Sequence, residues 1–169
     1  MDISVLSLIV AILALILAIY ALSEASKSKK QPANETTNDA ATRSLQLQAY
    51  ERLVLLTERI AIPNLISRSS QPGLDARQMQ LLLLDNIKQE YDYNASQQIY
   101  VSLTAWDAVK KLKEQNMLVI NQVGSGLPAG ATGLDLNRKL LEVIMSTQNG
   151  AVHEIVLEVL NLEAKKAMR

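Results

Sequence analysis

Residues 3–22, ISVLSLIVAILALILAIYAL, contain no charged side chain. As an α-helix such a run is roughly 30 Å long, which matches the hydrocarbon thickness of a bilayer. A segment inside lipid must satisfy its own backbone hydrogen bonds, so a single run of this kind has to be helical. Tyr20 lies near one end, where an amphipathic ring suits the membrane interface. We therefore predict a transmembrane anchor over residues 1–23 that contacts membrane lipid through residues 3–22.

A cleaved signal peptide is the alternative for the same segment. Ala21, Leu22 and Ser23 fit the small-residue pattern of a cleavage site. Signal peptides, however, place a basic segment before an apolar stretch of about 7–15 residues. Here no lysine or arginine precedes the run, and the run is longer. These differences favour the anchor.

The basic residues beside the anchor predict its orientation. Lys27, Lys29 and Lys30 follow the apolar run, and basic residues concentrate on the cytoplasmic side of membrane proteins. We therefore expect a single-pass protein whose C-terminal part lies in the cytoplasm.

The polar stretch after the anchor separates it from the rest of the chain. Residues 24–42 include Pro32, many small polar side chains and no apolar periodicity, which is typical of a flexible linker. Residues 43–169 then form the predicted helical domain.

Apolar residues in this domain recur with helical spacing, and no run alternates as a β-strand does. We expect an all-α fold, a small bundle of about five helices. Asp75 and Asp135 are predicted N-caps, and the run Leu81 to Leu84 predicts a helix buried on several sides. The expected helices cover about 43–62, 76–91, a segment after Ser102, 136–146, and a segment from 152 onward.

Composition excludes several classes of function. The chain has 17 basic and 17 acidic residues, without the basic excess of a nucleic-acid-binding protein. It has no cysteine and one histidine, His153, so we expect no metal site. The loop at residues 124–133 is rich in glycine, but an acid, Asp135, stands where a phosphate would bind. We expect no cofactor and, for want of a catalytic motif, no enzymatic activity.

An unusual tract, YDYNASQQIYVS, covers residues 91–102 and contains three of the five tyrosines. Tyrosine offers a large apolar body with a polar tip. The tract therefore suits either a hydrogen-bonded packing corner or a protein-binding surface, and the sequence leaves both open. The candidate partner-binding residues are Tyr91, Tyr93, Asn94, Gln97, Gln98, Tyr100 and Trp106.

The same tract, together with AWDAVKKLKEQ at residues 105–115 and LQAYERLVLLTERIAIPNLISR at residues 47–68, resembles an uncharacterised family of small, single-pass bacterial membrane proteins. The resemblance covers most of the chain and implies a location in the bacterial inner membrane. It implies no activity, cofactor or catalytic residue.

These patterns together favour a membrane-tethered interaction or scaffold protein that binds a protein partner. Association with further copies of this chain stays open. A stalk subunit of a membrane complex is the alternative, although Pro63 and Pro72 interrupt the long helix that such a subunit needs. An enzyme with an unrecognised site is the least favoured interpretation.

The anchor can be tested by washing isolated membranes with alkaline carbonate, which removes peripheral proteins. Because a spanning helix is held by its apolar surface, we expect the full-length chain to stay in the membrane pellet. Recovery of the chain in the supernatant, or a mature N-terminus near Glu24, would contradict the anchor.

Overall fold

The computed structural model describes residues 33–146 and 149–168. The chain divides after Ala41, and Thr42–Arg169 forms the unit described here. The predicted anchor and the first part of the predicted linker lie outside the described residues. Among the helices that are described, none combines the length and apolar character that crossing a membrane requires.

The described residues form α-helices and one short 3-10 helix, and they contain no strand. The prediction of an all-helical fold is therefore confirmed for this part of the chain. The described residues contain six α-helices where about five were expected, because the chain breaks at Ala61 and Pro63 lies in the first turn of a separate helix. The elements are α2 (Ala33–Ile60), α3 (Ile62–Ser69), α4 (Ala76–Tyr93), η1 (Ala95–Ile99), α5 (Leu103–Ser125), α6 (Gly133–Ser146) and α7 (Asn149–Ala167).

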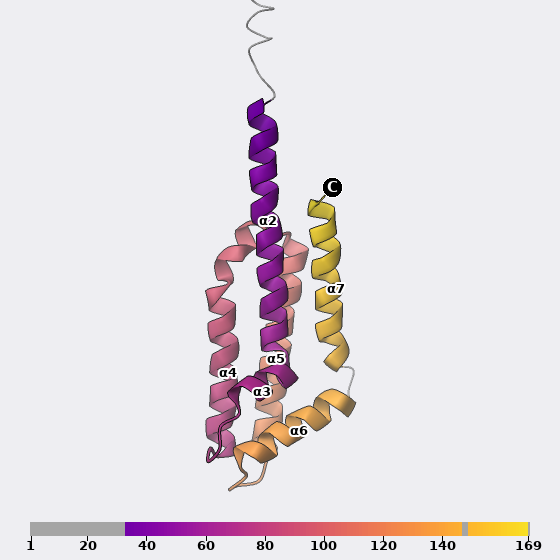
Figure 1. The fold of residues 1–169 in the computed structure, drawn as a ribbon. Helices are drawn as coiled ribbons and strands as arrows, with labels where there is room; N and C mark the ends of the chain where they lie inside the picture. Colours follow the sequence, from indigo (N-terminus) through magenta and orange to yellow (C-terminus); the bar gives the residue numbers. More distant parts are fainter. Residues whose placement is uncertain (1–32, 147–148, 169) are drawn as a thin grey trace, which may run out of the picture. The chain divides into compact units, whose positions relative to one another are not determined.

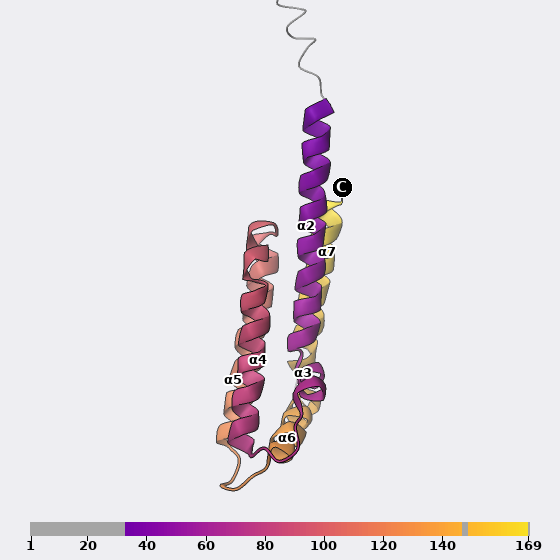
Figure 2. The ribbon, with the colours of Figure 1, turned by 60° about the vertical axis from the view of Figure 1, so that its left-hand side comes forward.

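Four long helices build the unit. Helices α4, α5, α7 and the Thr42–Ile60 part of α2 run lengthwise, while the shorter α3 and α6 lie at one end (Figure 1). Figure 2 shows α4 and α5 in one layer and α2 and α7 in the other.

The core consists of the apolar side chains that these helices turn toward one another. Leu53, Leu56 and Ile60 of α2 are fully buried, as the predicted apolar face requires. Leu83 of α4 is also fully buried, but Leu81 is 51% exposed, so the expectation that this leucine run is buried on several sides is wrong at that position. Each buried leucine or isoleucine stabilises the unit by about 1.5–3 kcal/mol relative to an exposed one.

Helix α2 begins ten residues before the start that we predicted at Arg43. Residues 33–42, which we assigned to the flexible linker, are helical. The described side chains from Asp39 to Thr42 are all exposed. A helix with solvent on every side shows no apolar periodicity, so the sequence pattern does not reveal it.

The starts of α4 and α6 are fixed by capping boxes. Asp75 caps α4 as predicted, since its carboxylate accepts from Gln78 N at 2.7 Å and Gln78 Oε1 accepts from Asp75 N at 3.1 Å. Asp135 is not the cap of α6, because it lies within the first helical turn. Thr132 takes that role, and its hydroxyl accepts from Asp135 N at 3.2 Å.

The Asp135 carboxylate completes the second capping box. It accepts hydrogen bonds from the hydroxyl and the backbone N–H of Thr132 at 2.7 and 3.0 Å. The hydrogen bond from the Thr132 hydroxyl has the larger effect and the one from the Thr132 backbone N–H the smaller. Together they hold the pKa of Asp135 below its usual value. Their contribution to the stability of α6 is therefore complete above the ordinary pKa of an aspartate, and it is lost as the pH falls through the lowered value.

Two backbone hydrogen bonds join the loops that precede α4 and α6. Ala76 N donates to Ala131 O, and Gly133 N donates to Leu74 O, both at 2.9 Å. A Cβ atom on Gly133 would lie 3.0 Å from Met79 Cβ and 3.1 Å from Leu74 O. Neither neighbour is the free end of a side chain, so the junction has no room for a larger residue.

We expect Gly133→Ala to lower the free energy of unfolding by about 1–3 kcal/mol, the usual cost of overpacking. Gly126→Ala is the matched control, because a Cβ there would meet its nearest neighbour at an ordinary 3.5 Å. Urea titrations of both variants measure the difference. Equal stabilities would contradict the close junction.

Candidate functional site

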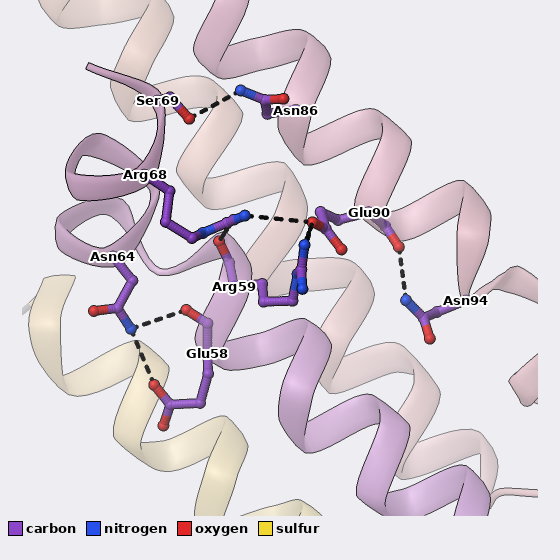
Figure 3. Close-up of polar contacts among 8 residues, drawn as sticks. All are labelled: Glu58, Arg59, Asn64, Arg68, Ser69, Asn86, Glu90 and Asn94. Atoms are coloured by element: carbon purple, nitrogen blue, oxygen red, sulfur yellow. Dashed lines mark hydrogen bonds and ion pairs between the residues drawn. The ribbon is translucent and has the colours of Figure 1, made fainter. Parts of the chain in front are cut away.

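The end of α2 positions the side chains of the candidate site. A helix leaves its last carbonyls without backbone donors, and Pro63 has no N–H to give to Arg59 O. Side chains replace the missing donors. Asn64 Nδ2 donates to Glu58 O at 3.0 Å, Arg68 Nη2 donates to Arg59 O at 2.7 Å, and Asn116 Nδ2 donates to Ile60 O at 2.8 Å (Figure 3 shows the first two side chains). The buried Asn116 thus finds the partner that its place on the apolar face of α5 requires.

The same segment forms a small ionic cluster, drawn in Figure 3. Arg59 Nε and Nη2 lie 2.7 and 2.6 Å from Glu90 Oε1 of α4, and Arg68 Nη1 lies 3.6 Å from that oxygen. The arginine side chains are 53% and 41% exposed. Exposed pairs of this kind contribute about 0–1 kcal/mol, so the cluster matters more for orienting Arg59 than for stability.

A groove of about 530 Å³ lies beside this cluster, between α2 and α4. We call it the α2–α4 groove. Leu55 within it is 61% exposed and Tyr93 is 74% exposed, so large apolar surfaces face solvent there. The lining residues are Arg52, Leu55, Leu56, Arg59, Gln89, Glu90, Tyr93 and Asn94.

Two of the seven predicted residues, Tyr91 and Trp106, pack against each other. Their ring centroids are 5.1 Å apart, and Trp106 is 9% exposed. Lys113 Nζ lies 4.2 Å from the centre of the Tyr91 ring. Burial and the nearby Glu114 carboxylate, in that order, raise the pKa of Tyr91. These contacts describe a packing corner.

The amide side chains of the tract bind neighbouring backbone carbonyls and the Ser96 hydroxyl. Asn94 and Gln97 are buried. Asn94 Nδ2 donates to Glu90 O at 2.9 Å and Gln97 Nε2 to Ser96 Oγ at 3.2 Å. Gln98 is exposed, and its Nε2 donates to Ala95 O at 2.9 Å. The amides therefore shape the turn between α4 and α5, where Asn94 also lines the groove.

The two remaining tyrosines face solvent in different places. Tyr93 lies in the groove, with Arg52 Cζ 5.9 Å from its ring centre. Tyr100 is 36% exposed, just after η1, and does not line the groove. The structure therefore does not bring the seven predicted residues into one surface.

Sequence reasoning missed Arg52, Leu55 and Arg59, because they belong to a different helix from the tyrosine tract. One feature of the sequence could have indicated the two arginines. Glu51-Arg52-Leu53 recurs as Glu58-Arg59-Ile60 one heptad later, which puts both arginines on the same side of a helix.

A second hollow, of about 230 Å³, lies beside His153. His153 Nε2 is 3.6 Å from Glu58 Oε2, and the imidazole is largely covered. Among the described residues, no group of three histidines or acids is placed to hold a metal ion.

We expect Tyr91→Ala to lower the free energy of unfolding by about 1–3 kcal/mol, because it removes a partly buried ring stacked on Trp106. Tyr93→Ala, two residues away, removes an exposed ring and should change stability by less than about 0.5 kcal/mol. Thermal unfolding of the two variants tests whether Tyr91 stabilises the fold and Tyr93 does not. Equal losses would show that both rings are structural.

A family described as "Family of unknown function (DUF7935)" matches residues 1–167. No curated protein and no solved structure matches this chain significantly.

Proposed function

This chain belongs to that family of unknown function, and we propose that it is a membrane-tethered interaction protein whose helical unit binds a protein partner in the α2–α4 groove. One observation carries the proposal. Arg52, Leu55 and Tyr93 expose a cation, an aliphatic surface and an aromatic ring side by side, while neighbouring residues of the tract are engaged in packing.

The residue types in the groove are those that bind protein partners strongly. Arginine and tyrosine are enriched at the energetic centres of protein interfaces. Tyrosine also loses little conformational entropy on binding, because it has few rotatable bonds. Tyr93 and Arg52 already hold each other through a cation–π contact, so the groove would need little rearrangement to accept a partner.

The tether rests on the sequence. The uncharged run at residues 3–22 would hold the protein in the bacterial inner membrane, and Lys27, Lys29 and Lys30 would keep the helical unit in the cytoplasm. The role we propose is non-catalytic. It brings a partner to the membrane and needs no cofactor.

Site-specific photo-crosslinking in intact cells tests this function. A photoreactive amino acid replaces Leu55 or Tyr93 in the full-length chain. The control is Leu134, which is 64% exposed at the start of α6 and does not line the groove. We expect both groove positions, and not position 134, to crosslink to the same protein in the membrane fraction.

Two results would contradict the proposal. Crosslinks of equal yield at all three positions would show that contacts are unspecific. Absence of crosslinks at positions 55 and 93 would show that the groove holds no protein.

A further inference from the structure

The α2–α4 groove has an unbalanced charge. Of the residues that line it, Arg52 and Arg59 are cationic and Glu90 is acidic. Glu90 is already paired with Arg59. Arg52 makes no ion pair with any residue that the structure describes, and its guanidinium lies over the face of Tyr93. Its exposed guanidinium is therefore open to a carboxylate of another molecule.

The positions along α2 define what such a molecule must present. Arg52, Leu55 and Arg59 are three and four residues apart, so they form one stripe on the helix surface. The rise of a helix separates the two arginines by about 10 Å along the axis. Leu55 lies between them and is 61% exposed. The stripe thus offers an apolar contact with Arg52 on one side and the Arg59–Glu90 ion pair on the other.

We propose that the groove selects an acidic segment of a protein partner, in which an aspartate or glutamate binds Arg52 and an apolar or aromatic side chain covers Leu55 and Tyr93. The planar guanidinium matches a carboxylate through two parallel hydrogen bonds. The groove already accommodates one arginine–carboxylate pair, in which Nε and Nη2 of Arg59 lie 2.7 and 2.6 Å from the same oxygen, Oε1 of Glu90. This inference rests on the proposed function, because it names the chemistry of the partner.

Other ligands fit the groove less well. A small anion would bind Arg52 but leave Leu55 and Tyr93 uncovered. A nucleic acid would need several cations for successive phosphates, whereas Arg59 is occupied by Glu90 and the chain has no basic excess. A protein segment satisfies the cation, the leucine and the ring together.

Selection from a displayed library of random peptides tests the inference. The target is the full-length chain in lipid nanodiscs, after depletion of peptides that bind empty nanodiscs. We expect the recovered peptides to combine aspartate or glutamate with leucine or aromatic residues. Loss of one charge-assisted contact should weaken their binding to Arg52→Ala by about tenfold or more.

Matched variants distinguish the effect of the charge of Arg52 from the effect of removing any arginine from α2. Arg43→Ala removes an exposed arginine of the same helix outside the groove, and it should leave the dissociation constant unchanged. Arg52→Glu should reject the acidic peptides and accept versions in which lysine replaces the acids. Circular dichroism checks that each variant keeps its helices.

The remaining outcomes distinguish the two proposals. Neutral or basic peptides that depend on Leu55 and Tyr93 would overturn the acidic preference and leave the proposed function standing. Peptides that ignore every groove variant, or no peptides at all, would overturn both. Self-association of the chain that Arg52→Glu abolishes would identify the occupant as a second copy and overturn the acidic partner.

Discussion

The last carbonyls of α2 depend on side chains for their hydrogen bonds. A continuous helix would satisfy these groups with backbone N–H donors, but the chain turns at Ala61 and Pro63 supplies no donor. Asn64, Arg68 and Asn116 donate instead. An unsatisfied buried carbonyl costs about 1–3 kcal/mol. The bond from Asn116 to Ile60 O, which is the buried one of the three, therefore allows the chain to turn against the core. The three bonds also fix α2 relative to α3 and α5 and thereby set one wall of the groove.

Much of the helical structure could be predicted from the sequence, because the capping residues and the spacing of buried apolar residues indicate the same helices. Asp75 and Ser102 are N-caps, and each precedes the helix predicted after it. The misses have local causes too. The early start of α2 lacks an apolar face, and Asp135 lies one turn inside α6 because Thr132, three residues earlier, takes the capping position. In a capping box the earlier of the two partners is the cap, so the spacing of Thr132 and Asp135 indicates Thr132.

The candidate site was less predictable, since it combines two helices distant in sequence. Composition singled out the tyrosine tract, but it could not say which ring faces the core. Tyr91 and Tyr93 are two residues apart on α4, which turns them to different sides, so one packs on Trp106 and the other lines the groove. The arginines that complete the groove come from α2, and only tertiary packing brings them to Tyr93. The spacing of apolar residues along one helix does not predict which other helix will pack beside it.

The junction between the loops before α4 and α6 has a consequence for local opening. The first N–H groups of a helix normally have no partner and exchange their hydrogens rapidly with water. Ala76 N and Gly133 N are instead bonded across the junction to Ala131 and Leu74. Each hydrogen is protected from exchange as long as its bond across the junction holds. Hydrogen exchange at these two amides therefore reports the opening of this end of the unit as one event.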